Sequence, residues 1–168
     1  MSNKIARELI QGLGILIVDH NPHMRRLTRM MLTTLGAKSV YEAADGLAAL
    51  EIVRTNNPDV MVLDRDVPVL SGAELLQIVR SPDLFPKPDL PVIMVMQTAQ
   101  RADVIEALRL GAHELLLKPT SPKALQDRLL SVIDQAGRIQ LPPHALKLFP
   151  DRRAVIEVGE DDLRITPP

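Results

Sequence analysis

Residues 59–72 of the chain read DVMVLDRDVPVLSG, and this stretch is a strong indicator of the fold. Four apolar residues run directly into Asp64, and the chain turns at Pro68 before a helix opens at Ser71. A short run that is apolar throughout predicts a strand buried on both faces, as in a parallel sheet covered by helices. Asp64 would then lie at the carboxyl end of that strand, where open parallel sheets bind ligands, so it is a candidate site residue.

The same succession of an apolar run and an amphipathic segment repeats along residues 14–137. Most of the amphipathic segments open at a capping residue or Pro, and they close at Gly or shortly before Pro. Five alternations predict a doubly wound α/β domain on a five-stranded parallel sheet, with the more polar run 39–43 at its edge. The expected strands are residues 15–18, 39–43, 60–63, 92–96 and 115–117, and the expected helices begin near residues 22, 46, 72, 101 and 122.

The segments outside this domain are short. Residues 1–13 form a lead-in whose apolar spacing fits either a short amphipathic helix or a frayed segment. Residues 138–168 form a proline-rich tail, and we expect no output domain there because so few residues cannot build a separate core. Within the tail, residues 154–158 are the one strand candidate. The prolines of residues 81–91 predict a loop inside the domain.

The composition disfavours several classes of partner. A net charge of −1 and an aromatic content of 2% favour neither nucleic acid nor an anionic membrane surface. The chain has no cysteine, which excludes disulfides and thiolate metal sites, and its apolar runs are too short to span a bilayer. We therefore expect a cytoplasmic protein that contacts neither nucleic acid nor a membrane.

Polar residues follow the buried runs at the edge where the parallel strands end. Asp19 and His20 follow the first run, Asp64 the third and Lys118 the fifth, while residues 96–98 end the fourth. Two carboxylates at one edge repel each other unless a cation lies between them, and oxygen ligands suit Mg²⁺. A nearby ammonium can pair with an incoming phosphoryl oxygen. The pattern predicts a site for a divalent cation and a phosphoryl group.

Four motifs make the chain resemble a response-regulator receiver domain of the chemotaxis-regulator type over residues 15–135. They are ILIVDHNPHMRRL (15–27), VMVLDRDVPVLSG (60–72), PVIMV (91–95) and GAHELLLKP (111–119). The resemblance implies the flavodoxin-like strand order 2-1-3-4-5. It also implies phosphoryl transfer to an aspartate from a histidine kinase or phosphotransfer protein, with Mg²⁺ as the cofactor.

The resemblance assigns roles to individual residues. Asp64 corresponds to the phosphoacceptor, and Lys118 to the lysine that pairs with the phosphoryl group. Asp19 and Asp64 correspond to carboxylate ligands of the metal, and Asp66 to the ligand that uses its backbone carbonyl. Pro119 corresponds to a cis-proline that aims Lys118. Phosphorylation would then change the face formed by the fourth helix, fifth strand and fifth helix of the domain, where a protein partner or a second copy of the chain could bind.

Three residues depart from the family pattern. His20 replaces an acidic metal ligand, which predicts weaker Mg²⁺ binding. It either ligates a softer metal, such as Mn²⁺ or Zn²⁺, or is only a surface or cap residue. Met96 replaces the Ser or Thr that hydrogen-bonds the phosphoryl group, and Met cannot donate that bond. Leu115 replaces the aromatic switch residue, and Thr98 could supply a hydroxyl only if the strand end rearranged.

Three functions are compatible with these motifs. The first is a single-domain response regulator, not an enzyme, phosphorylated at Asp64 and signalling by protein–protein contact. The second is a degenerate adaptor that works without phosphorylation. The third is a phosphatase of the haloacid-dehalogenase type, because the apolar strand followed by DRDV (64–67) resembles the DxDxV nucleophile motif of that family, with Asp66 as the general acid/base. Arg65 would either form a local ion pair with Asp66 or remain a solvated charge on the loop.

Overall fold

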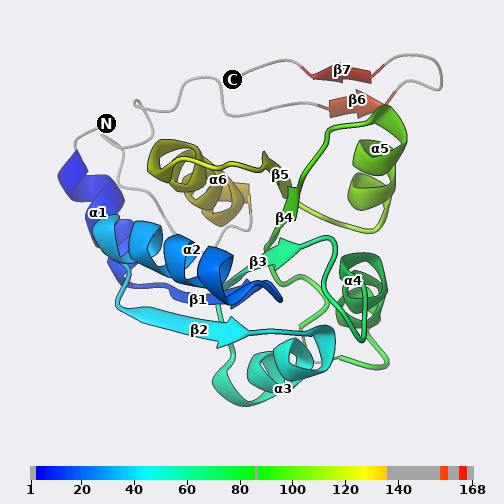
Figure 1. Ribbon diagram of the computed structural model, residues 1–168, viewed down its shortest axis with the longest axis horizontal. Helices are drawn as coiled ribbons and strands as arrows, with labels where there is room; N and C mark the ends of the chain where they lie inside the picture. Colours follow the sequence, from blue (N-terminus) through cyan, green and yellow to red (C-terminus); the bar gives the residue numbers. More distant parts are fainter. Residues whose placement is uncertain (1–2, 86, 136–155, 159–162, 166–168) are drawn as a thin grey trace.

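A computed structural model gives the fold, and it describes residues 3–85, 87–135, 156–158 and 163–165 (Figure 1). Five parallel strands form one sheet in the order β2-β1-β3-β4-β5, which confirms the predicted doubly wound class and strand order. The strands are β1 (Gly14–Val18), β2 (Ser39–Ala43), β3 (Val60–Asp64), β4 (Val92–Met96) and β5 (Glu114–Leu117). The helices are α1 (Asn3–Gln11), α2 (Pro22–Thr34), α3 (Gly46–Asn56), α4 (Gly72–Arg80), α5 (Arg101–Arg109) and α6 (Pro122–Gln135).

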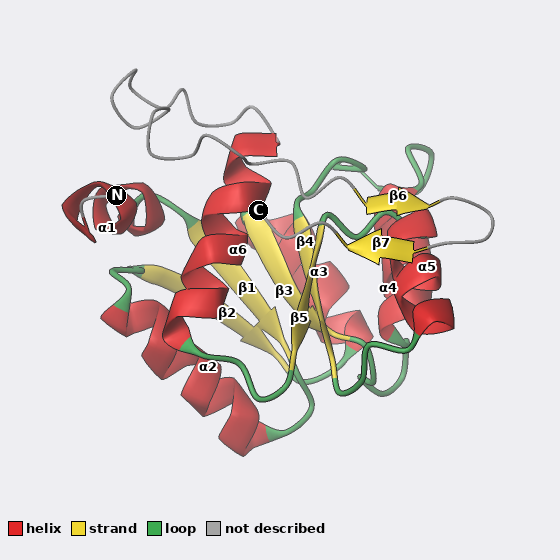
Figure 2. Ribbon diagram, turned by 90° about the horizontal axis from the view of Figure 1, so that it is seen from above, coloured by secondary structure: helices red, strands yellow, loops and turns green. Residues whose placement is uncertain are grey.

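Helices cover both faces of the sheet (Figure 2). Because side chains alternate along a strand, Met61 and Leu63 of β3 pack with α3, α4 and α5, whereas Val60 and Val62 pack with α1, α2 and α6. All five residues of β3 are buried. The central apolar run therefore supplies both halves of the core and brings Asp64 to the carboxyl edge.

Local signals explain where the helices begin. Asn21 accepts hydrogen bonds from two N–H groups of the first turn of α2, and Pro22 follows it. Ser71 and Glu74 form a reciprocal capping box at the start of α4. Gly72 fits there because a Cβ on it would lie 2.9 Å from the Cα of Arg65. The chain after β3 is thus packed tightly against the start of α4.

Residues 1–13, expected as a helix or a frayed lead-in, contain the helix α1. Ala6 and Ile10 of α1 are buried in the core cluster that also contains α6, and Leu13 joins the same cluster. Arg7 donates a hydrogen bond from its guanidinium to the carbonyl of Thr34 at the end of α2, 3.1 Å away. The helix is therefore part of the packed domain.

Two short strands lie near the end of the chain, β6 (Ile156–Val158) and β7 (Leu163–Ile165), and they pair antiparallel. Of the predicted strand 154–158, residues 156–158 form β6, and residues 154 and 155 lie outside the described residues. Strand β7 was not expected from the sequence, because three residues are too few to show a period. No helix of the described chain is both long and apolar enough to cross a membrane.

Candidate functional site

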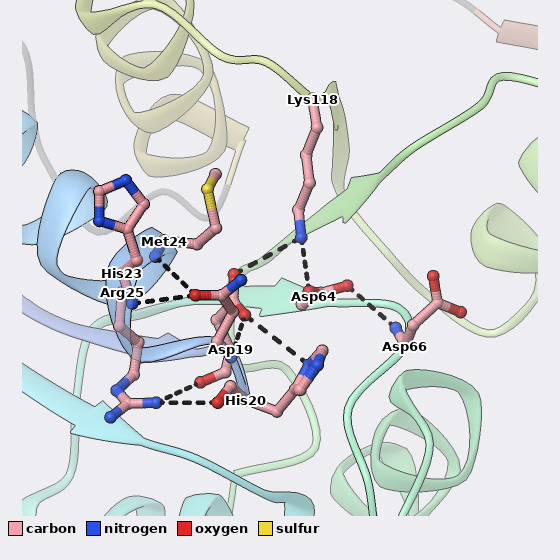
Figure 3. A network of polar contacts seen from close by, with 9 residues as sticks. Asp19, His20, His23, Met24, Arg25, Asp64, Asp66 and Lys118 are labelled. Atoms are coloured by element: carbon pink, nitrogen blue, oxygen red, sulfur yellow. Dashed lines mark hydrogen bonds and ion pairs between the residues drawn. The ribbon is translucent and has the colours of Figure 1, made fainter.

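The carboxyl edge of the sheet brings together three of the predicted site residues (Figure 3). Asp19 follows β1, Asp64 ends β3 and Lys118 follows β5. The Nζ of Lys118 lies 2.6 Å from Oδ2 of Asp64 and 3.5 Å from Oδ2 of Asp19. One ammonium therefore pairs with two carboxylates that come from neighbouring strands.

Asp64 is buried and held by hydrogen bonds to both of its carboxylate oxygens. Its side chain is 4% exposed, Oδ2 accepts from Lys118, and Oδ1 accepts from the N–H of Asp66, 3.0 Å away. The N–H of Arg65 donates to the carbonyl of Val95 on β4, which fixes the chain directly after the acid. Asp64 is consequently presented at the sheet edge in one defined orientation.

Asp19 is held by the loop that leads into α2. Its side chain is 8% exposed, and Oδ1 accepts from the N–H of Asn21. Arg25 donates to the backbone carbonyl of Asp19 at 2.8 Å, and its guanidinium also pairs with Glu42 on β2. The sequence analysis missed Arg25, because no local signal shows that a residue of α2 reaches back to the end of β1.

Lys118 keeps its positive charge in this setting. Its side chain is 18% exposed, and burial alone would lower the pKa of the ammonium. The hydrogen bond and charge of Asp64, together with Asp19, outweigh burial and raise the pKa above its ordinary value. The Lys118–Pro119 peptide bond is cis, as the resemblance implied. A fixed cation therefore faces the two acids.

The acids can hold a divalent cation. One ligand atom from each of Asp19, His20 and Asp64 lies within 4.8 Å of the others. Two buried carboxylates provide the hard oxygen ligands that Mg²⁺ requires, so this donor set fits the ion that the family binds. His20 is less well placed as a metal ligand than the two acids, because its side chain is 55% exposed and its Nδ1 lies 3.9 Å from Oδ1 of Asp19. Asp66 is exposed, and the role of its carbonyl stays a prediction.

Two of the three predicted switch residues line one groove of the structure, and the third is not among its lining residues. Met96 is buried and Leu115 is partly buried, and both line an apolar groove of about 360 Å³. Other lining residues, including Val104 and Arg128, come from α5 and α6. Thr98 is exposed in the loop after β4 and is not among the groove residues. Met96 and Leu115 therefore border the face that, according to the resemblance, changes on phosphorylation.

Arg65 differs from both sequence-based expectations. Its Nη2 lies 2.8 Å from Oδ1 of Asp103 and 3.8 Å from Oε2 of Glu106, both on α5. The expected partner, Asp66, contributes only a longer-range attraction. Sequence reasoning missed this contact because Arg65 and Asp103 are far apart in the chain, and no short-range spacing relates them.

Comparisons with known proteins agree with this geometry. The family model for the response regulator receiver domain matches residues 15–130. A CheY homolog of Campylobacter jejuni is 37% identical over 121 residues, which are 71% of this chain and 91% of that protein. The chemotaxis protein CheY of Pseudomonas aeruginosa is 34% identical over 73% of this chain and 98% of its own length.

Solved structures give the same result. The receiver domain of Francisella response regulator 1452 matches with a TM-score of 0.67 and 28% identity, over 74% of this chain and 98% of that one. The chemotaxis response regulator CheY4 of Vibrio cholerae matches with a TM-score of 0.65 and 28% identity, over 71% and 98% of the two chains. Proteins of this family are signalling proteins and generally not enzymes, which leaves the phosphatase alternative without support. From its sequence, its sheet topology and the acids at the sheet edge, the chain belongs to the response regulator receiver domain family.

Proposed function

We propose that this chain is a response regulator that accepts a phosphoryl group on Asp64 from a histidine kinase or phosphotransfer protein. The observation that carries the proposal is the buried Asp64 carboxylate 2.6 Å from the Lys118 ammonium, with Asp19 at the same sheet edge. This arrangement keeps a nucleophilic carboxylate beside a fixed positive charge. The relatives named as chemotaxis proteins support the same class of function.

The chemistry follows from these positions. A carboxylate oxygen of Asp64 attacks the phosphorus of a phosphohistidine, so that a P–O bond forms while the P–N bond breaks and its electron pair stays on the imidazole nitrogen. Lys118 stabilises negative charge on the transferring phosphoryl oxygens. A divalent cation held by Asp19, Asp64 and the carbonyl of Asp66 would neutralise further charge there. The protein mainly positions groups and supplies fixed charge.

The signal would leave the domain through a protein contact. The groove of about 360 Å³ between α5, β5 and α6 is mostly apolar in its lining, which suits a protein segment or a second copy of the chain. Met96 and Leu115 border it in place of the usual hydroxyl and aromatic residues. The response of this face therefore does not use the ordinary pair of switch residues.

A second candidate is an adaptor that works without phosphorylation. His20 supports it, because a partly exposed imidazole replaces a carboxylate in the metal site and weakens binding of a hard cation. Met96 supports it as well, since a thioether cannot donate a hydrogen bond to a phosphoryl oxygen. The two candidates differ in one property, the ability of Asp64 to carry a phosphoryl group.

Intact-mass analysis after incubation with acetyl phosphate distinguishes the candidates. The wild type is compared with Asp64→Asn and with Asp127→Asn, which removes an exposed carboxylate on α6, in Mg²⁺ and separately in Mn²⁺. We expect a phosphoryl adduct on the wild type and Asp127→Asn, and none on Asp64→Asn. An adduct that persists on Asp64→Asn would overturn the assignment of the acceptor. No adduct with either cation would favour the adaptor.

A further inference from the structure

Arg65 connects the acceptor residue to α5. It follows Asp64 directly in the chain, and its guanidinium pairs with Asp103 at 2.8 Å and approaches Glu106 at 3.8 Å. The Arg65 side chain is 31% exposed, so the pair is only partly shielded from water. The hydrogen bond to Asp103 outweighs the effect of burial and raises the pKa of the guanidinium. The contact joins the site edge to the first turn of α5.

The backbone of Arg65 is held by hydrogen bonds on both sides, while its side chain is 31% exposed. Its N–H donates to the carbonyl of Val95 at 3.0 Å, and its carbonyl accepts from the N–H of Gly72 at 3.0 Å. A Cβ on Gly72 would lie 2.9 Å from the Cα of Arg65, so the two backbones are in close contact. A rearrangement that keeps these backbone contacts would change the side-chain partner of Arg65 and leave the loop in place.

The start of α5 depends on few interactions. Its N-cap residue, Gln100, makes no side-chain cap hydrogen bond in the part of the chain that the structure describes. Asp103 in the first turn suits the positive end of the helix with or without Arg65. The ion pair with Arg65 therefore ties the first turn of α5 to the site, and the helix could keep its own structure if that tie were broken.

A phosphoryl group on Asp64 would compete for the same guanidinium. It adds roughly −1.5 to −2 charges and three acceptor oxygens, by analogy with other phosphorylated side chains. The Lys118 ammonium already pairs with the carboxylates of Asp64 and Asp19. Met96 supplies no donor, and a planar guanidinium matches phosphate oxygens in two parallel hydrogen bonds. Consecutive Cα atoms are about 3.8 Å apart, so the exchange requires the Arg65 side chain to turn from α5 toward the new charge on its neighbour Asp64.

We infer that Arg65 is a phosphoryl-binding residue, which exchanges Asp103 and Glu106 for the phosphoryl group on Asp64 and so releases the first turn of α5. This inference rests on the proposed phosphorylation of Asp64. Val104, next to Asp103, lines the groove between α5, β5 and α6. The exchange would thus connect the acceptor to the output groove without a switch hydroxyl or aromatic residue.

Hydrogen exchange of α5, read beside intact mass, tests the inference. The proteins are the wild type, Arg65→Gln, Arg65→Lys and the control Arg101→Gln, which removes an exposed arginine from the same helix. Each is measured with and without acetyl phosphate and Mg²⁺. We expect phosphorylation to speed exchange in the first turn of α5 about threefold in the wild type and in Arg101→Gln. In Arg65→Gln, exchange should be fast from the start and unchanged by phosphorylation, and Arg65→Lys should restore part of the response.

The two readings separate failure of the inference from failure of the proposed function. If the adduct forms and α5 of Arg65→Gln responds as strongly as the wild type, Arg65 is not the residue that senses the phosphoryl group. If the adduct forms on the wild type and exchange of α5 is unchanged, the release of α5 is wrong while the acceptor assignment stands. If no adduct forms on the wild type, the proposed function fails, and the inference fails with it.

Discussion

The substitution Lys118→Met tests how strongly the two buried acids depend on one ammonium. Methionine keeps a flexible apolar stem but leaves Asp19 and Asp64, 8% and 4% exposed, without their shared cation. At an effective dielectric constant of about 20, separations of 2.6 and 3.5 Å give gross attractions of about 6 and about 5 kcal/mol, most of which desolvation cancels. Breaking a buried pair costs about 3 to 5 kcal/mol net, and the 18% exposure of Lys118 favours the lower end.

We therefore expect Lys118→Met to lower the free energy of unfolding by about 3 kcal/mol and the melting temperature by about 10 °C. Urea unfolding followed by far-UV circular dichroism measures the change in chelator-treated protein. Saturating Mg²⁺ should restore more stability to Lys118→Met than it adds to the wild type, because both cations neutralise the same carboxylates. The matched control is Lys123→Met, whose ammonium belongs to a side chain 81% exposed and which should change stability by less than about 0.5 kcal/mol. Equal stability of the two variants would show that the buried acids do not depend on the Lys118 ammonium.

Other perturbations test separate features of the domain. Val69 has φ 71°, and the Leu70 N–H bonds to the Pro68 carbonyl at 2.9 Å, a γ-turn that strains a β-branched residue. Val69→Gly should raise the free energy of unfolding by about 1 kcal/mol, and an unchanged urea midpoint would argue against strain. His20→Asp should increase Mg²⁺ affinity about tenfold in calorimetric titration; unchanged affinity would place residue 20 outside the metal site. Because the pKa of Lys118 is raised, its stabilising effect should be complete below pH 10.5 and disappear at higher pH. Lys118→Met should lack that alkaline loss in urea titrations, and an equal loss in both proteins would assign it to other groups.

The sheet and its covering helices were predictable because their signals are local. Apolar runs, capping residues and prolines each act within a few residues, and they locate β1 to β4 and the helices that follow them. Strand β5 begins one residue earlier than predicted, at Glu114. Glu114 is a buried carboxylate directly before the apolar run, and only the structure shows that Arg128 and Ser131 of α6 satisfy it, at 3.1 and 2.5 Å.

The site was predictable to the extent that strand ends determine it. Asp19, Asp64 and Lys118 meet because parallel strands end at one edge, which the order of elements already implies. The contact of Arg65 with α5 was not predictable, since it depends on how far that helix stands from the end of β3. The hydrogen bond from the Arg25 guanidinium to the Asp19 carbonyl was not predictable for the same reason. Long side chains that bridge separate elements carry no periodic signal in the sequence.

Helix α1 changes where the folding unit of this chain begins. The family match starts at residue 15, yet Ala6, Ile10 and Leu13 lie in the same core cluster as α6. A protein trimmed at the family boundary would therefore expose a surface that α1 normally covers, and a partner fused directly before β1 would have to displace the helix or be displaced by it. The sequence motifs identify the family, but the packing of α1 determines where an independently folding domain has to begin.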